Sequence, residues 1–415
     1  MSIMKRFGFS ILQLVLFSLL FTVLSCSEKD PAWLSYHKST AKPAEQGGGG
    51  GGIIEEDDDP ESDVPQPGED PEPEPDPDPD PVDPSPQGPT EPEWPVDNHW
   101  FQTRGIILTW EDVQTMDWIA LAKTCGINTF SINNFPSIGG KAWKDYVAKC
   151  TQNGIRICYE DHMGSQLIPR SLFKNHPEYF RMNEQGQRVD DVNFCVTNPE
   201  VQQRVRDNAI ELGKAYAPTN HRYYFWGDDF GKKCHCPNCK QYTDVEQWLI
   251  VENIVIDALR TIDDKAMLAH LLYDNTMQYP STRVLPHEGI FLQFAPIHRK
   301  WNYCISNSSV QGGAGQTHGY MTNCLKEHLK IFPVETCEVL EYWLAVTMSS
   351  NWTKPVKKIA QWYPSVYQQD IAYYASLGIR NIVTYGMWIG GDYYKAFGDI
   401  QFVKDYGNGL LNYSK

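Results

Sequence analysis

The sequence of 415 residues lacks several features that mark nucleotide-binding and nucleic-acid-binding proteins. Lys and Arg number 36 against 52 Asp and Glu, which gives a formal net charge of −16 and leaves no basic face to favour a nucleic acid. The chain has no P-loop for phosphates and no Gly-x-Ser-x-Gly turn of the kind that carries a serine nucleophile. These absences exclude several common classes of enzyme.

Positive charge is missing altogether from residues 55–93, which hold 17 acidic residues, most of them next to proline. Proline keeps the backbone extended and like charges repel, so this stretch predicts a semi-rigid disordered spacer. A glycine run at 47–52 precedes it. Most of the acidic charge belongs to this spacer, and residues 94–415 carry a net charge of only −1. The low isoelectric point therefore says nothing about the ligand of the folded part.

The amino terminus reads as an export signal. Lys5 and Arg6 precede an apolar run at 7–23, and small residues lead to Cys26. The sequence around Cys26 resembles a bacterial lipobox, which implies cleavage before this cysteine and attachment of lipid to its thiol. An uncleaved membrane anchor is the alternative, although the run is near the short limit for spanning. We expect a signal peptide at 1–25 and a tether at 26–96. The protein would then be an exported lipoprotein, at the outer membrane and cell surface, with the membrane as partner through the lipid.

The remaining chain alternates helical and strand patterns. Three times a glycine stands between an amphipathic stretch and an apolar run, at Gly126, Gly154 and Gly378. Glycine accepts the left-handed conformation that ends a helix, and an apolar run after it suits a strand buried on both faces. We expect eight strands, at 105–110, 127–133, 155–159, 223–226, 267–273, 290–294, 335–340 and 381–385.

Eight strands with intervening helices predict a (β/α)8 TIM barrel over residues 97–415. An open doubly wound sheet is the competing fold. It would require a glycine-rich phosphate turn after the first strand, where Leu108, Thr109, Trp110 and Glu111 stand instead.

Barrel enzymes take their catalytic groups from the carboxyl ends of the strands. Those ends carry carboxylates, amides, histidines and large aromatic residues here, a set that suits a sugar: rings stack on pyranose faces, and polar groups bind hydroxyls. The expected substrate-binding residues are His162, Trp226, Tyr273, Asp274, His298, Tyr342, Trp343 and Trp388. Trp301 and Trp352, in long loops, are further candidates for sugar platforms.

Glycoside cleavage needs a carboxylic acid that protonates the leaving oxygen, and it usually needs a second carboxylate. Asp229 is the expected acid, with Asp228 orienting the substrate and Glu341 as nucleophile or base. Asp228 and Asp229 could instead bind loop amides or cap a helix, and Glu341 could belong to a structural ion pair.

A cysteine group follows Asp229 at once, with Cys234, Cys236 and Cys239 at chelate spacing. Zinc prefers four ligands, and Cys195 is a candidate fourth, with His235 a weaker one. The expectation is a structural zinc that takes no part in catalysis. The exported location favours disulfides as the alternative.

At this point the sequence shows a resemblance. Asn175–Phe180 reads NHPEYF, 194–200 reads FCVTNPE, Asp229 lies five residues before the cysteine group, and 340–343 reads LEYW. This ordered set resembles domain-of-unknown-function family 4838, which implies an exported barrel of glycan-degrading systems. Trp226, Gly227, Asp228 and Asp229 also resemble the Asp-Glu pair of family 20 hexosaminidases. In that family the second acid protonates the bond, and the first orients the substrate's acetamido group.

The sequence thus predicts a lipid-anchored glycoside hydrolase that uses two carboxylates or substrate-assisted chemistry on a glycan. A surface lipoprotein that captures glycan without cutting it remains the alternative, and a purely structural surface protein is a third possibility. The oligomeric state, the sugar and the linkage have no signature in the sequence.

Overall fold

A computed structural model describes residue 94 and residues 97–133, 140–280 and 283–415. The expected signal peptide at 1–25, the expected lipid attachment site Cys26 and the expected tether up to residue 93 lie outside the described residues. Among the described helices, none is both long and apolar enough to cross a membrane.

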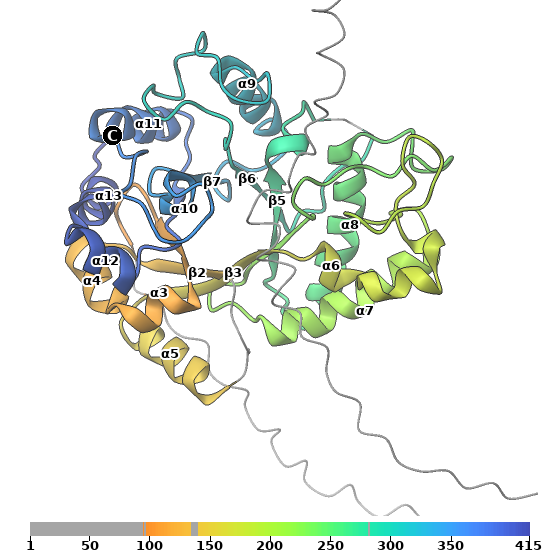
Figure 1. Ribbon diagram of the computed structural model, residues 1–415, viewed down its shortest axis with the longest axis horizontal. Helices are drawn as coiled ribbons and strands as arrows, with labels where there is room; N and C mark the ends of the chain where they lie inside the picture. Colours follow the sequence, from red (N-terminus) through yellow and green to blue (C-terminus); the bar gives the residue numbers. More distant parts are fainter. Residues whose placement is uncertain (1–93, 95–96, 134–139, 281–282) are drawn as a thin grey trace, which may run out of the picture. The chain divides into compact units, whose positions relative to one another are not determined.

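Eight parallel strands form a closed barrel in which each strand pairs with the next and β8 pairs with β1 (Figure 1). The predicted (β/α)8 fold is confirmed. The strands are β1 Thr103–Thr109, β2 Thr129–Asn133, β3 Arg156–His162, β4 Arg222–Trp226, β5 Met267–Leu272, β6 Ile290–Phe294, β7 Glu338–Glu341 and β8 Asn381–Tyr385.

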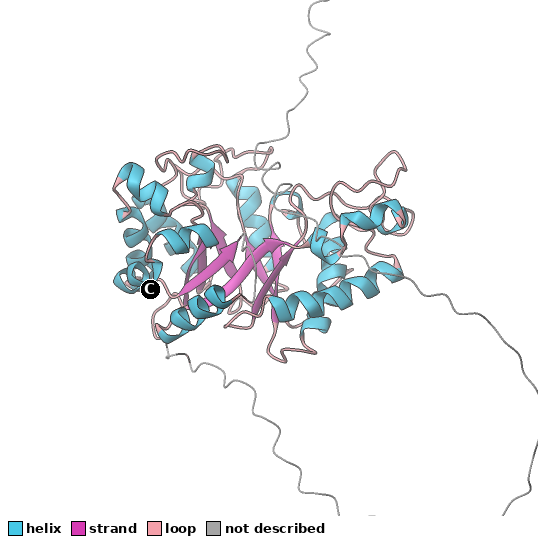
Figure 2. Ribbon diagram, turned by 60° about the horizontal axis from the view of Figure 1, so that its bottom comes forward, coloured by secondary structure: helices cyan, strands magenta, loops and turns pink. Residues whose placement is uncertain are grey.

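Helices surround the strands (Figure 2). They are α3 Trp110–Thr115, α4 Trp118–Cys125, α5 Lys141–Gln152, α6 Gly164–Leu167, α7 Pro199–Ala215, α8 Asp244–Leu259, α9 His318–His328, α10 Val346–Ser349, α11 Pro364–Ser376, α12 Gly391–Phe397 and α13 Gln401–Leu411. Three 3-10 turns are η1 Arg170–Lys174, η2 Pro177–Tyr179 and η3 Asp274–Thr276.

Local signals explain where several helices begin and end. Gly126, Gly154 and Gly378 have φ values of 73°, 72° and 94°, the left-handed conformation expected of them. Helix α8 begins with a capping box, in which the Thr243 side chain accepts from the Glu246 N–H and the Glu246 carboxylate accepts from the Thr243 N–H. This cap fixes the end of the loop that follows β4.

A cluster of buried polar side chains lies inside the barrel. Gln293 Nε2 donates to Glu160 Oε2 at 3.0 Å and to Glu338 Oε1 at 2.9 Å, and Gln293 Oε1 accepts from Trp226 Nε1 at 2.9 Å. Burial, and then the charge of Glu338, raise the pKa of Glu160 to about 8. Glu160 is therefore protonated at neutral pH.

Two strand ends differ from expectation in ways that matter for the site. β3 continues to His162, so Glu160 lies inside the strand and faces the barrel interior. β7 begins at Glu338 rather than at residue 335, and its last residue is Glu341. Side chains alternate between the two faces of a strand. Leu340 and Tyr342 belong to the interior cluster, so Glu341 faces outward, toward the helices.

Candidate functional site at the mouth of the barrel

The carboxyl ends of the strands, here called the mouth, bring together one carboxylate with a tyrosine and a histidine. Asp229 follows β4 and is 21% exposed at its side chain. The Tyr273 hydroxyl donates to Asp229 Oδ1 at 3.2 Å, and His162 Nε2 lies 3.8 Å from Asp229 Oδ2. Asp229 thus stands between partners at the ends of β3 and β5, and it is partly accessible to a ligand.

His162 is oriented by the backbone. Its Nδ1 lies 2.5 Å from the Gly227 carbonyl oxygen, which can only accept, so Nδ1 carries a hydrogen. Its Nε2 is then turned toward Asp229. His162 and Asp229 thus face each other at the mouth, an imidazole beside a carboxyl group.

A second carboxylate and histidine lie on the far side of Tyr273. Asp274 Oδ1 is 2.7 Å from His298 Nε2, and both side chains are about one quarter exposed. Burial raises the pKa of the Tyr273 phenol well above its usual value, and the charges of Asp229 and Asp274 add to that rise. Both carboxylates therefore lie near the Tyr273 phenol, and Asp229 accepts its hydrogen bond.

Aromatic rings form a wall beside these groups. Tyr342 and Tyr385 stack with ring centroids 5.6 Å apart. Trp301 packs on Tyr342 and Trp352 packs on Tyr385, each with centroids 5.8 Å apart. The charge of Asp229 contributes to raising the pKa of both tyrosines, after burial, which sets this wall near the acid. Such faces suit the carbon-bound hydrogens of a sugar ring.

Asp228 has a different environment from Asp229. It is bound by the Arg170 guanidinium, by the Ser165 N–H at 3.0 Å and by the Asn193 N–H at 2.6 Å. Only 11% of its side chain is exposed. Asp228 therefore ties the β4–α8 loop, residues 227–243, to the β3–α7 loop, residues 163–198.

The two loops also meet at four cysteines. Cys195 of the β3–α7 loop lies with Cys234, Cys236 and Cys239 of the β4–α8 loop. All four are buried, and their sulfur atoms lie within 4.8 Å of one another. Four thiolates in this arrangement could bind a structural metal ion. The structure thus brings Cys195 to the cysteine group, as the sequence predicted.

Comparison with known proteins identifies the family. The profile of a domain of unknown function, DUF4838, matches residues 89–396, about three quarters of the chain. The chain belongs to this family. No curated protein matches the DUF4838 chain.

Solved structures resemble the DUF4838 barrel only distantly. A family 20 β-N-acetylglucosaminidase is 10% identical, with 77% of this chain and 71% of that one covered and a TM-score of 0.42. A family 5 glycoside hydrolase from Prevotella bryantii B14 is also 10% identical, with 75% and 97% covered and a TM-score of 0.42. The pneumococcal exo-β-D-N-acetylglucosaminidase is 9% identical, with 75% and 85% covered and a TM-score of 0.41. At these values the resemblance extends to the fold alone.

Glu341 does not meet Asp229 at the mouth of the DUF4838 barrel. It is fully buried outside the strands, where its Oε1 accepts from Arg299 Nη1 at 2.5 Å and from the Tyr374 hydroxyl at 2.5 Å. Arg299 also pairs with Asp370 at 2.8 Å. Burial raises the pKa of Glu341 to about 7. This environment favours the structural ion pair that the sequence left open.

The other predicted binding residues divide into two groups. His162, Tyr273, Asp274, His298 and Tyr342 surround the mouth as described, and Trp388 is half-buried beneath the Lys354 ammonium, 5.4 Å from its ring centroid. Trp226 is inside the barrel, and Trp343 packs outside it, where its Nε1 donates to Asp370. A sugar at the mouth would not reach these two buried tryptophans directly.

Sequence reasoning missed Tyr385, although it is the last residue of β8 and could have been found by the same rule that found Tyr273. It also missed Arg170 and Arg299, which neutralise Asp228 and Glu341 from 58 and 42 residues away in the chain. Residues so distant in sequence give no local signal of such a pairing.

Proposed function

We propose that the DUF4838 barrel is a glycoside hydrolase in which Asp229 protonates the glycosidic oxygen. The observation that carries this proposal is the partly exposed Asp229 carboxyl group at the mouth, between the Tyr273 hydroxyl and His162 Nε2. A general acid must be within reach of the substrate. The Tyr273 hydroxyl and the His162 ring support this role because they fix the position of the Asp229 carboxyl group.

Asp274 takes the place that Glu341 was expected to have. It is a second carboxylate near the Tyr273 phenol, and its partner is His298. Both side chains of this pair are about one quarter exposed. In this proposal the pair accepts a proton from the attacking water while Asp229 gives one to the leaving oxygen. Attack by the substrate's own acetamido group is the alternative route for an amino sugar. The half-buried rings of Tyr385, Trp301 and Trp352 would hold the sugar faces, with the buried Tyr342 packed behind them.

Capture of a glycan without cleavage is the second candidate. It is favoured by the burial of Glu341, because the two-carboxylate pair predicted from the sequence does not converge on the mouth. The aromatic wall and the polar groups would serve binding equally well.

A screen of aryl glycosides and of host and plant glycans tests both candidates. It should compare the natural protein with Asp229→Asn, Asp274→Asn and, as a control, Asp207→Asn on the exposed face of α7. We expect Asp229→Asn to lower kcat by at least ~100-fold while a sugar still binds, because a positioned acid contributes about 10²–10⁴. The control should keep full turnover.

Equal turnover by the natural protein and Asp229→Asn would refute the assignment of the acid. Binding by all four proteins with turnover by none would favour capture. If Asp229→Asn is inactive and Asp274→Asn retains full turnover, the substrate-assisted route replaces the Asp274–His298 pair.

We further propose export and lipid attachment at Cys26. We also propose a structural zinc ion in the four-cysteine cluster, and this ion takes no part in the chemistry. The charged start, the apolar run and the small residues before Cys26 support the first part. Fractionation of cells grown with labelled fatty acid tests it. The natural protein should carry the label in the membrane fraction, and Cys26→Ser should lose it.

A further inference from the structure

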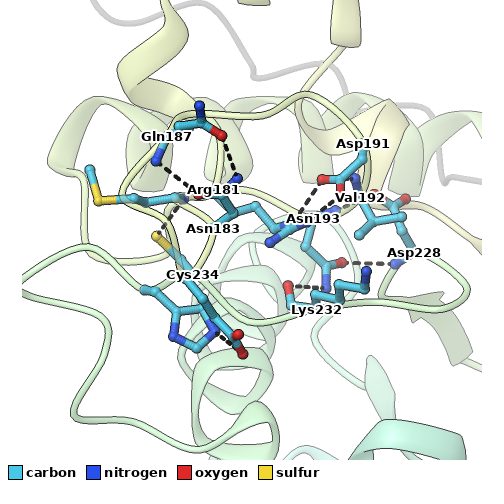
Figure 3. Close-up of polar contacts among 12 residues, drawn as sticks. Arg181, Asn183, Gln187, Asp191, Val192, Asn193, Asp228, Lys232 and Cys234 are labelled. Carbon is cyan, nitrogen blue, oxygen red and sulfur yellow. Dashed lines mark hydrogen bonds and ion pairs between the residues drawn. The ribbon is translucent and has the colours of Figure 1, made fainter.

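Residues 227–234, which carry Asp229, are held at two points by one neighbouring loop. At the first point Asn193 clamps Asp228: the Asn193 N–H donates to Asp228 Oδ2, and Asn193 Oδ1 accepts from the Asp228 N–H at 3.0 Å. Asn193 Nδ2 also donates to the Lys232 carbonyl at 3.4 Å, so one side chain spans the turn that contains Asp229 (Figure 3). This set of contacts is the Asn193 clamp.

The second point is the four-cysteine cluster. Cys195 stands two residues after Asn193, and Cys234 stands five residues after Asp229. Cys195 Sγ lies 3.7 Å from Cys236 Sγ and 3.8 Å from Cys239 Sγ. Four sulfur atoms at zinc's usual bond length of about 2.3 Å, arranged as a tetrahedron, are about 3.8 Å apart. The two separations from Cys195 match that spacing, and all four sulfur atoms lie within 4.8 Å of one another.

The surroundings of the sulfur atoms suit negatively charged thiolates. Cys234 Sγ accepts from the Met182 N–H at 3.3 Å and lies 3.9 Å from Arg188 Nη1, and the Thr197 hydroxyl is 3.1 Å from Cys239 Sγ. Such outer contacts fix metal ligands and balance their charge. Four buried thiolates around a divalent ion leave two negative charges, and the Arg188 guanidinium offsets part of that excess.

Gln247 of α8 holds the cysteine turn in shape. Its Nε2 donates to the Cys234 and Cys239 carbonyls, both at 2.9 Å, and its Oε1 accepts from the Cys234 N–H at 2.8 Å. Two of the ligand residues, Cys234 and Cys239, are therefore held by a helix side chain, and Cys195 comes from the other loop. An ion that joins these four atoms cross-links the loops.

We propose that metal binding at the four cysteines positions Asp229. The ion and the Asn193 clamp anchor the short segment around Asp229 from both sides, so loss of the ion frees one anchor and lets the acid move. Cys195, Cys234, Cys236 and Cys239 are positioning residues, with zinc as the ion that their chemistry favours. The effect on turnover rests on the proposed role of Asp229, whereas metal binding and loop order do not.

The test uses the full chain, purified under reducing conditions, with Cys195→Ser compared with Cys324→Ser, a buried cysteine of α9 outside the cluster. Elemental analysis should find one zinc per chain in the natural protein and in Cys324→Ser, with a large loss in Cys195→Ser. Cobalt substitution should give the intense charge-transfer absorption of a tetrahedral thiolate site. Hydrogen exchange should accelerate in 180–198 and 227–243 when zinc is removed.

Turnover should fall on the order of 100-fold with zinc removed and return when zinc is added back, since small displacements of an acid cost this much. If Cys195→Ser does not fold, titration of the natural protein with a chelator gives the same readings. Zinc-free natural protein, or a disulfide within the cluster in non-reducing mass spectra, would overturn the proposal. So would zinc removal that leaves exchange in both loops unchanged. If the natural protein turns over no glycan, zinc content and hydrogen exchange still decide the metal part.

Discussion

Glu341 shows how a residue of the right type at a strand end can have the wrong surroundings for catalysis. It shares the Arg299 guanidinium with Asp370, and the Tyr374 hydroxyl completes the group. All of these partners are buried. Breaking such a pair leaves an uncompensated charge, so its main effect is on stability.

We expect Glu341→Gln to lower the free energy of unfolding by about 3 kcal/mol, because it leaves Arg299 with one acidic partner fewer in a buried site. Turnover per folded molecule should stay within about twofold of the natural protein. Urea unfolding and active-site kinetics on the folded fraction measure the two effects. A loss of kcat comparable to that of Asp229→Asn would restore Glu341 as nucleophile or base.

Glu160 predicts a pH dependence of stability. Its pKa is about 8 in the folded protein against an ordinary value of 4.5, so between these pH values the folded state keeps a proton that the unfolded chain has lost. The free energy of unfolding therefore falls as the pH rises from about 4.5 to about 8. Glu160→Gln removes this titration and can still accept from Gln293.

The substitution Glu160→Gln should raise the free energy of unfolding by roughly 1–3 kcal/mol at pH 8 and change it little at pH 5. Denaturant titrations at several pH values, with Glu211→Gln on the exposed surface as control, measure this. Parallel stability curves for the natural protein and Glu160→Gln would contradict the raised pKa.

At the scale of elements, the two loops beside α7 and α8 deserve a direct mutational test. Asn193 has φ of 51°, a left-handed conformation that glycine also adopts easily. Asn193→Gly therefore keeps the backbone and its N–H bond to Asp228, and it removes the two side-chain contacts of the clamp, to the Asp228 N–H and the Lys232 carbonyl. We expect kcat to fall roughly 10- to 100-fold, with zinc content unchanged.

The matched control for Asn193→Gly is Asn238→Gly, an exposed position in the β4–α8 loop. It should leave kcat as it is. If both variants behave alike, general loosening of the loops rather than the clamp accounts for the change, and the role given to Asn193 is wrong.

The sequence predicted most of the strands and all eight of their places in the order. Apolar runs, such as those after Gly126, Gly154 and Gly378, were the signal for a strand, because a parallel barrel buries both faces of its strands. The strand ends were harder. β7 begins three residues later than expected and has only four residues. So short a strand gives too little alternation in the sequence to show which of its acids faces inward.

The candidate site could be predicted in part for the same reason. Asp229, Tyr273 and His162 were found from their places after or at the end of strands. Asp228 is bound by Arg170 and Asn193 of another loop, whereas Asp229 stays accessible. Which of two adjacent acids faces a ligand depends on that tertiary contact, and local sequence does not record it.

At the scale of the whole molecule, a few side-chain contacts connect the residues before β1 to the barrel. Trp94 donates to the Thr219 carbonyl and stacks on Arg156, and Asp97 pairs with the buried Arg104 at 2.7 Å. We expect residues 87–415 to unfold at the same denaturant concentration as the full chain.

A shorter chain of residues 99–415 should have a free energy of unfolding about 2 kcal/mol lower than residues 87–415. This is the cost of leaving a charged hydrogen-bonding group such as Arg104 without its partner. Denaturant unfolding of the three chains side by side measures the difference. Equal stability of the two shortened chains would mean that the contacts of Trp94 and Asp97 contribute nothing.

These same contacts fix the direction from which the barrel is held. Trp94 and Asp97 touch Arg104, Arg156, Asn128 and Thr219, which all lie at the amino-terminal ends of strands, opposite the mouth. The chain therefore enters the barrel at its base. A polymeric ligand that binds at the mouth approaches from the opposite end, so its access does not require these contacts to open.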